Sequence, residues 1–394
     1  MPYRVLTLGN ISSRGLERLP RDSYDVASDI ADPDAIIVRS ADMHAMEIPA
    51  SVRAVGRAGA GTNNVPVAAL SRRGVPVFNA PGANANAVKE MVIAGLFLAA
   101  RNVCQAWGHV RELRGDDHAI EAAVEKGKKQ FVGHELPGRV LGVIGLGAIG
   151  VEVANAAHRL GMRVLGFDPE LTVQRALQLS SGVERALSLD DVFARADMVT
   201  VHVPLVASTR HLVNAARLMS MRPGGTILNF SRAGIVDVAA VVDALDRHTL
   251  SSYVCDFPTS AIKDHPRVVA LPHLGACTHE AEENCAVMVA DTLREFLEHG
   301  NIRCSVNFPD ASLSRAAGAS RMSVANENVP NMVGQIATSL AAANLNIANL
   351  LNKSRGDLAY ALIDIDGRIP DAILGEIRAI PGVLSVRCVP DLSS

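Results

Sequence analysis

The stretch GRVLGVIGLGAIGVEVANAAHRLG occupies residues 138–161 and decides the fold of the middle of the chain. An apolar run of the kind that forms a buried strand leads into glycines at 145, 147 and 150, and a segment with helical spacing follows. A GxGxxG pattern in this setting indicates a dinucleotide site. The first glycine permits the tight turn, the second admits a pyrophosphate, and the third lets helix and strand pack closely. The alternative is a glycine-rich turn that binds nothing.

Asp168 ends the next apolar run, 18 residues beyond Gly150. A carboxylate at this place accepts hydrogen bonds from the ribose hydroxyls of adenosine and repels a 2′-phosphate, which favours NAD over NADP. A plain turn aspartate before Pro169 is the other interpretation.

Short apolar runs and helical segments alternate on both sides of this motif, and such alternation builds parallel sheets covered by helices. After an irregular segment at 301–318, the last residues follow the order strand–helix–strand–strand–helix–strand, which is typical of a ferredoxin-like domain. The predicted fold class is α/β, with two Rossmann-like doubly wound domains and a C-terminal ferredoxin-like α+β domain. The predicted upstream strands are Tyr3–Gly9, Asp34–Ser40, Arg53–Gly61 and Val75–Gly82, and the predicted helices are Val67–Gly74 and Asn86–Arg101.

Composition excludes several classes of protein. Lys plus Arg is 38 and Asp plus Glu is 41, so the net charge of −3 argues against a nucleic-acid or anionic-membrane binder. The longest apolar helical stretch, Met91–Ala100, is too short for a membrane span of about 20 residues. The N-terminus lacks the pattern of a signal peptide, and the six cysteines lack metal-ligand spacing. We expect a cytoplasmic protein with reduced thiols and no bound metal.

Six motifs together resemble the D-isomer-specific 2-hydroxyacid dehydrogenases, over Arg53 to about Asn307. The motifs are RAGAGTNNV, VFNAPGANANAV, VLGVIGLGAIG, DMVTVHVPL, LNFSRAGIVD and PHLGACTHEAEEN. The terminal pattern resembles an ACT regulatory domain. We therefore expect a discontinuous substrate-binding domain, an NAD-binding domain, a linker and an ACT-like domain. Their predicted ranges are 1–88 with 276–310, 89–275, 311–319 and 320–394.

The resemblance assigns the chemistry to Arg232 and His273. Arg232 would hold the substrate carboxylate and polarise the C2 oxygen, a task suited to a planar guanidinium that stays charged. His273 would take the hydroxyl proton while hydride passes to the nicotinamide. Outside these motifs, the favoured interpretations would be a surface loop arginine for Arg232 and a core histidine for His273. The cofactor contacts that the resemblance implies are Gly145, Gly147, Ala148, Ile149, Gly150, Asp168, Phe230, Ser231, Arg232, Asp256, His273, Gly275 and Ala276.

One stretch departs from the family. The family's glutamate partner of the catalytic histidine lies in a stretch resembling DVFPTEP, whereas residues 256–260 are DFPTS, one residue shorter, and Ser260 stands where the glutamate belongs. Some members of the family use a lysine in the active site, so we hypothesise that Lys263 contributes to catalysis. A solvated loop lysine is the alternative, and Lys89 is a weaker rival.

Two further arginines bear on the substrate. By resemblance, Arg39 and Arg57 would bind a substrate phosphate. A dianionic phosphate accounts for two cationic side chains. Ordinary surface arginines are the alternative. The substrate carboxylate would bind the turn Gly59, Ala60 and Gly61, with Asn84 facing the same site. The expected reaction is oxidation of 3-phospho-D-glycerate to 3-phosphohydroxypyruvate with NAD, which begins L-serine biosynthesis. The alternatives are another 2-hydroxyacid dehydrogenase, such as a glyoxylate or hydroxypyruvate reductase, and a non-enzymatic NAD-sensing protein.

The terminal domain carries three asparagines, Asn326, Asn328 and Asn346, where related ACT domains bind serine at a dimer interface. The sequence departs from those domains, because Asn326 replaces a histidine and Pro330-Asn331 replaces a Pro-Gly turn. L-serine is therefore one expected effector, and a purely oligomerising domain is the alternative. Edge pairing of such sheets predicts a homodimer or homotetramer.

Overall fold

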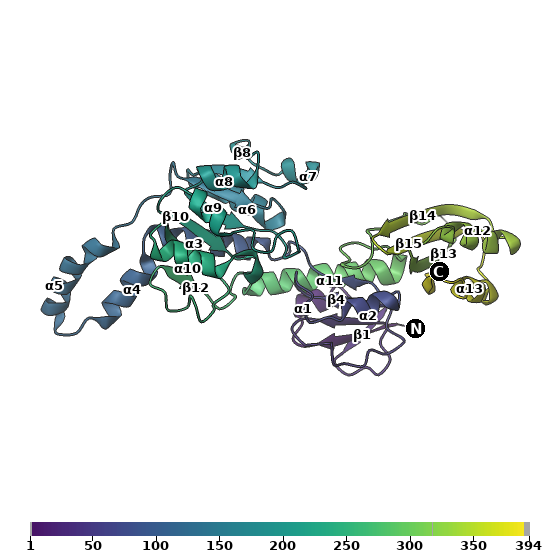
Figure 1. Ribbon diagram of the computed structural model, residues 1–394. Helices are drawn as coiled ribbons and strands as arrows, with labels where there is room; N and C mark the ends of the chain where they lie inside the picture. The colour runs from purple at the N-terminus through teal and green to yellow at the C-terminus, as the bar shows by residue number, and fades with distance from the viewer. Residues whose placement is uncertain (1, 317, 390–394) are drawn as a thin grey trace. The chain divides into compact units, whose positions relative to one another are not determined.

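The computed structural model describes residues 2–316 and 318–389. The chain divides into two compact units, one formed by residues 1–84 with 279–394 and the other by residues 85–278 (Figure 1). Residues 1, 317 and 390–394 of the predicted domain ranges lie outside the described residues. The predicted boundaries at 88/89, 275/276 and 319/320 stay predictions.

The unit 85–278 is built on a seven-stranded parallel sheet in the order β12-β11-β10-β9-β6-β7-β8. The chain starts in the middle at β6, runs outward to β8, and then returns to fill the other side from β9 onward. Sheets of this order bind ligands beyond the carboxyl ends of their strands where the direction reverses, here between β6 and β9. The strands are β6 (Val140–Ile144), β7 (Arg163–Phe167), β8 (Val183–Arg185), β9 (Met198–Val201), β10 (Gly225–Asn229), β11 (Leu250–Cys255) and β12 (Val268–Ala270).

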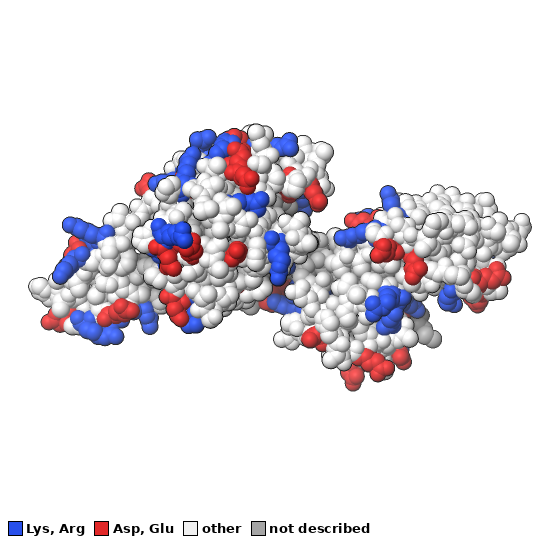
Figure 2. All heavy atoms as spheres, viewed as in Figure 1, with Lys and Arg blue, Asp and Glu red and all other residues white. Residues whose placement is uncertain are grey.

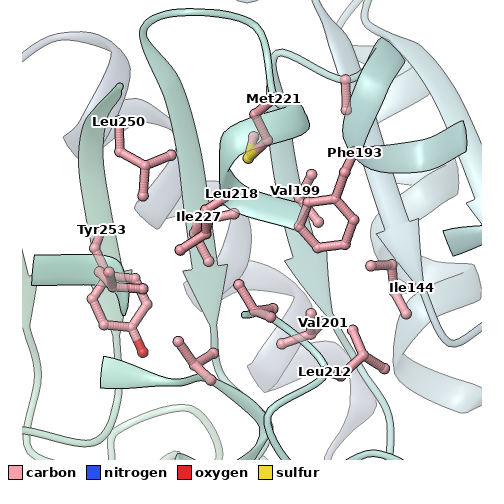
Figure 3. Close-up of a cluster of buried hydrophobic side chains, with 14 of the residues drawn as sticks. Ile144, Phe193, Val199, Val201, Leu212, Leu218, Met221, Ile227, Leu250 and Tyr253 are labelled. Carbon is pink, nitrogen blue, oxygen red and sulfur yellow. The ribbon is translucent and has the colours of Figure 1, made fainter. Parts of the chain in front are cut away.

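Helices cover both faces of this sheet, which confirms the predicted doubly wound fold. On one face, side chains of α8, α9 and α10 pack with Ile144, Val199, Ile227 and Tyr253 into an apolar cluster (Figure 3). On the other face, α3 and α6 pack over a second cluster that includes Val92. The helices are α3 (Ala85–Ala100), α4 (Val103–Glu112), α5 (Asp117–Gly127), η1 (Lys128–Phe131), α6 (Ala148–Arg159), α7 (Val173–Ala176), α8 (Leu189–Arg195), α9 (Ala215–Ser220), η2 (Ala233–Ile235) and α10 (Val238–Asp246).

The other unit contains a five-stranded parallel sheet in the order β2-β1-β3-β4-β5. Helix α11 packs against β4 so closely that a Cβ atom added at Gly56 would lie 2.4 Å from Val289 and 2.8 Å from Leu293. Strand β2 was not predicted from the sequence, because Asp25 interrupts the short apolar pattern of its four residues. The elements are β1 (Tyr3–Leu8), α1 (Ser13–Leu16), β2 (Tyr24–Ala27), β3 (Ala35–Val38), β4 (Ala54–Arg57), α2 (Val67–Arg72), β5 (Val77–Phe78) and α11 (His279–His299).

The same unit holds a four-stranded antiparallel sheet in the order β14-β15-β13-β16, called the terminal module below. Its strand and helix order confirms the ferredoxin-like prediction. Arg321 is buried and binds Asp364 through two nitrogens, at 2.7 and 3.0 Å, and Nη1 of Arg321 donates to the carbonyls of His299 and Leu313. These bonds tie the module to the end of α11. The elements are β13 (Ser320–Glu327), α12 (Met332–Ala342), β14 (Ile347–Arg355), β15 (Leu358–Ile365), α13 (Asp371–Arg378) and β16 (Val383–Val389).

Among residues 2–316 and 318–389, no helix has the length and apolarity needed to cross a bilayer.

Candidate active site

In the glycine loop between β6 and α6, two of the three glycines have no room for a side chain and the third has open space. Gly145 has a φ of +90°, and a Cβ atom there would lie 2.5 Å from the carbonyl oxygen of His202. A Cβ atom at Gly150 would lie 1.8 Å from the carbonyl oxygen of Gly145. A Cβ atom at Gly147 would meet nothing within 4 Å. The open space faces the first turn of α6, Ala148 and Ile149, whose N–H groups have no helical acceptor, so the loop fits a pyrophosphate.

Asp168 lies at the end of β7, beside this loop. Its two carboxylate oxygens accept from the backbone N–H groups of Leu146 and Glu170, each at 2.8 Å. A cavity of about 210 Å³ opens next to Asp168 and is lined by apolar side chains together with Glu184 and Arg185. Such a cavity suits an adenosine, with the carboxylate positioned for the ribose hydroxyls. The apolar lining residues are Leu146, Pro169, Leu171, Leu179 and Val183.

Arg232 follows β10 in a loop that is fixed by a buried asparagine. Nδ2 of Asn229 donates to the carbonyl of Arg232 at 3.0 Å, and the N–H of Ser231 donates to Oδ1 of Asn229 at 3.1 Å. The Ser231 hydroxyl donates to the carbonyl of Val203 at 2.6 Å, which ties the loop to the segment after β9. Arg232 is half-buried, and among the described residues no carboxylate pairs with it. Its guanidinium therefore keeps donors for an anionic ligand.

His273 lies in the loop after β12, at the same edge of the sheet. The carboxylate of Asp256 is 1% exposed and accepts from the N–H groups of Leu274 at 2.8 Å and Gly275 at 2.6 Å. The His273 backbone has a φ of +58°, and the centre of its exposed ring lies 5.3 Å from that of Phe257, with the two rings tilted by 59°. Asp256 therefore holds the loop that carries His273, and its expected contact with the cofactor stays a prediction.

Phe230 and Ala276 complete this edge as packing residues. Phe230 is buried, and its ring lies 3.9 Å from the position that a Cβ atom on Gly275 would take. Ala276 packs against the apolar cluster under α3 and α6. The loops that carry Arg232 and His273 thus meet through Phe230.

His202 was not singled out by the sequence, although it stands in the motif DMVTVHVPL. It follows β9, where the strand order reverses, and its Nε2 lies 3.0 Å from Oγ1 of Thr200. Burial lowers the pKa of His202 to about 4. The nucleotide edge of the sheet therefore contains a neutral imidazole at neutral pH.

In the other unit, Arg39 and Arg57 lie at the carboxyl ends of β3 and β4, where Val38 pairs in register with Arg57. Arg39 forms an ion pair with Glu282 of α11, and this contact holds the pKa of Glu282 below its usual range. The guanidinium of Arg57 lies over Gly59, where an added Cβ atom would be 1.6 Å from its Nη1. Glu282 was not predicted from the sequence, because nothing local links it to Arg39.

The turn that follows Arg57 is tied to its neighbours through the backbone. Nδ2 of Asn79 donates to the carbonyl of Ala60 at 2.6 Å, and the N–H of Ala80 donates to the carbonyl of Gly59 at 2.9 Å. Gly61 continues this turn. Oδ1 of Asn84 is buried and has no hydrogen-bond partner within the described part of the chain.

Comparison with known proteins decides the family. The pattern of the D-isomer specific 2-hydroxyacid dehydrogenase, NAD binding domain, matches residues 93–275. A D-3-phosphoglycerate dehydrogenase of Haemophilus influenzae is 31% identical over 348 residues, which cover 85% of this chain and 80% of that protein. This chain belongs to the D-isomer-specific 2-hydroxyacid dehydrogenases. The NAD assignment made from Asp168 is confirmed.

Other relatives differ in length and specificity. A D-3-phosphoglycerate dehydrogenase of Synechocystis sp. is 35% identical over 285 residues, which cover 70% of this chain and 49% of that protein. This chain thus spans from about half to four fifths of the length of these relatives. An NADPH-dependent glyoxylate/hydroxypyruvate reductase of Sinorhizobium meliloti has a TM-score of 0.64 at 25% identity, and the match covers 80% of this chain and all of that one.

In the stretch that departs from the family, 256–260, Asp256 is buried, Phe257 is half-buried and residues 258–260 are exposed. Ser260 is exposed. The ammonium of Lys263 is also exposed and forms an ion pair with Asp264, and the structure places no hydrogen bond between it and Arg232 or His273. Lys89, on α3, donates to Asn86. Neither lysine is joined to the catalytic candidates by a direct contact in this structure.

The three asparagines of the terminal module do not come together within one chain. Asn326 pairs in register with Ala359, near the start of β15, and Nδ2 of Asn328 donates to Gly356. Nδ2 of Asn346 donates to Asp366, just beyond the other end of β15. A strand of this length separates the two ends by roughly 24 Å. Only residues from two copies of the chain can therefore form one site from all three.

Proposed function

We propose that this protein oxidises 3-phospho-D-glycerate to 3-phosphohydroxypyruvate with NAD⁺ in the cytoplasm, at the start of L-serine biosynthesis. The observation that carries the proposal is the pair Arg39 and Arg57 at the carboxyl ends of two adjacent strands. Two guanidinium groups at one sheet edge match a dianionic phosphate better than the short uncharged tail of lactate or glyoxylate. The relatives named for this reaction support the same substrate.

Each proposed role follows from the local chemistry. Arg232 binds the substrate carboxylate through its planar fork and polarises the C2 oxygen. His273 accepts the proton of the C2 hydroxyl, and its loop is held in place by the buried carboxylate of Asp256. Bound NAD⁺ supplies the acceptor for the hydride that leaves C2.

The absence of the family's glutamate leaves two candidates for the proton acceptor. His273 is favoured by its fixed loop. Lys263 is the second candidate, and it would first have to leave Asp264. The pH dependence of kcat/KM in His273→Asn, Lys263→Ala and Lys263→Arg separates them. If Lys263 is the base, Lys263→Ala removes the acidic limb of the profile for oxidation, where protonation of the base lowers activity. If His273 is the base, Lys263→Ala keeps the profile and His273→Asn loses activity by at least about 100-fold.

The substrate test compares initial rates on 3-phosphohydroxypyruvate, hydroxypyruvate and glyoxylate with NADH. We expect the phosphorylated substrate to have the highest kcat/KM. Arg57→Gln should raise its KM by about tenfold or more and leave the KM for glyoxylate nearly unchanged. An equal rise in KM for both substrates would show that Arg57 does not bind the substrate phosphate.

A glyoxylate or hydroxypyruvate reductase is the second candidate. The ion pair between Arg39 and Glu282 favours it, because this arginine already has a carboxylate partner. Higher kcat/KM on glyoxylate than on 3-phosphohydroxypyruvate would establish it. A protein that binds NADH in a fluorescence titration but turns over none of the three substrates would instead be a nucleotide sensor.

For regulation we propose a homodimer or homotetramer in which terminal modules of two copies pair. Oδ1 of Asn326 is buried and has no partner among the described residues, which suits an added ligand or chain. L-serine at millimolar concentration should lower the initial rate, and Asn346→Ala should abolish this effect. Unchanged rates with serine, together with a dimer in sedimentation, would leave the module a purely oligomerising role.

A further inference from the structure

A cavity of about 280 Å³ lies inside the unit 1–84/279–394, where the terminal module meets the first sheet. One wall is the segment from Arg73 to Val75, after α2, and the other is the strand β16 from Leu384 to Arg387. The Ser385 hydroxyl donates to the carbonyl of Gly74 at 3.1 Å, so the two walls touch at one side. The cavity is distinct from the sheet edge that carries Arg39 and Arg57.

The lining of this cavity is basic. Four arginines contribute to it and no aspartate or glutamate does, and basic side chains gather over α2 on the face shown in Figure 2. Hydroxyl groups of Ser323, Tyr360 and Ser385 add neutral hydrogen-bonding groups. The four arginines are Arg53, Arg73, Arg378 and Arg387.

Within the described residues, three of the four arginines have no carboxylate partner. Arg53 pairs with Asp34 at 3.3 Å. Arg73 donates to the carbonyls of Ile48 and Pro49, and Arg378 donates to the carbonyl of Val386. Backbone carbonyls position a guanidinium without neutralising it. The cavity therefore carries an uncompensated positive charge of about three.

Arg387 has buried hydrogen-bond donors that no acceptor among the described residues satisfies. Its guanidinium stacks at 4.4 Å from the ring centre of Phe296, and Nη2 donates to the carbonyls of Phe296 and Leu297. Its Nε and Nη1 atoms are buried and have no acceptor among the described residues. Burial accordingly lowers the pKa of Arg387. Buried charged donors of this kind call for an acceptor, and an oxyanion satisfies several at once.

We propose that this cavity binds the phosphate group of a small phosphorylated metabolite and thereby fastens the terminal module to the first sheet. The ligand would accept from Arg387 and Arg378 on the module and from Arg73 on the sheet. The volume lies just below the roughly 300–1,000 Å³ of sites for drug-sized molecules, which suits a compact metabolite. The hydroxyls of Ser323 and Ser385 would bind the remainder of the molecule.

The test measures thermal unfolding of the full chain against inorganic phosphate and against 3-phosphoglycerate, each at constant ionic strength set with chloride. We expect saturable stabilisation of several degrees, because a ligand that binds only the folded state raises Tm. Arg73→Gln and Arg378→Gln should each reduce the apparent affinity by at least about tenfold. Arg72→Gln is the matched control, since Arg72 adjoins Arg73 and does not line the cavity.

An Arg57→Gln variant distinguishes the proposed substrate phosphate site from this cavity. This variant should keep the stabilisation by inorganic phosphate, even where it raises the KM for substrate. Loss of the phosphate effect in Arg57→Gln but not in Arg73→Gln would overturn the proposal and assign phosphate to the other site. Equal stabilisation of wild type, Arg73→Gln and Arg378→Gln would also overturn it. If 3-phosphoglycerate stabilises through Arg73 at lower concentration than inorganic phosphate does, the ligand is a phosphorylated metabolite rather than free phosphate.

Discussion

The carboxyl edges of the two parallel sheets are prepared for their ligands in different ways. At the edge of β6 to β12, Asp168, Asn229 and Asp256 each bind backbone groups of the loops that carry the functional side chains. At the edge of β3 and β4, Arg39 is held by another charge, Glu282. The first edge is preorganised by short-range bonds that a ligand leaves intact. The second holds a charge pair that an anionic ligand has to share or displace.

The largest effect on the preorganised edge is expected from a substitution in the glycine loop. Gly150→Ala places a Cβ atom in the space of the Gly145 carbonyl, so the loop must move by more than 1 Å. We expect NADH affinity to fall by at least about 100-fold, with a loss of stability of about 1–3 kcal/mol. Gly147→Ala meets open space, so its Tm should stay unchanged while NADH affinity falls by about tenfold. Fluorescence titration and thermal unfolding measure both. A Gly150→Ala protein that binds NADH normally would show that the loop is not preformed.

The neutral imidazole of His202 gives the next largest effect. Its pKa of about 4 lies below the ordinary value near 6.5, so the unfolded chain takes up the proton first as the pH falls. The contribution to stability is complete above pH 6.5 and is lost progressively down to pH 4, by up to about 3 kcal/mol. His202→Asn should flatten this part of the profile in urea unfolding from pH 7 to 4.5. An unchanged slope in the variant would mean that other groups cause the acid sensitivity.

The bonds from Asp256 to the His273 loop give an effect on turnover. Asp256→Ala removes both acceptors, and we expect kcat to fall by about 100-fold while KM for NADH changes little. Asp256→Asn keeps one acceptor, so its kcat should lie between those of Asp256→Ala and wild type. Asp243→Ala, which removes an exposed carboxylate of α10 that pairs with Arg247, is the control. Equal kcat values for Asp256→Ala and wild type would remove its role as a positioning residue.

The smallest effect is expected at the charge pair. Glu282→Gln removes the competing carboxylate from Arg39 and should lower the KM for a phosphorylated substrate by about fivefold. Glu283→Gln, whose native partner is the exposed Arg14, should leave this KM unchanged. A higher KM in Glu282→Gln would indicate that Glu282 aims Arg39 at the substrate.

Sequence patterns predicted what depends on neighbours along the chain. The glycine loop after β6, Asp168 at the end of β7, and the strands β1, β3, β4 and β5 follow from local spacing, whereas β2 was not predicted. Partners brought together by the fold were not predictable. Nothing in the sequence joins Glu282 to Arg39, and Asn346 lies at the far end of β15 from Asn326.

Helix α11 has a mechanical consequence. Its 21 residues form one rod of about 30 Å. The first turn carries Glu282 beside Arg39, and the carbonyls near its last turn receive Arg321 and Arg387 from the terminal module. A change in the orientation of one end of such a continuous helix also changes the orientation of its other end. Truncation of the chain before β13 would remove the donors to these carbonyls. The C-terminal end of α11 would then lose its attachment to the terminal module, while its first turn still contacts Arg39.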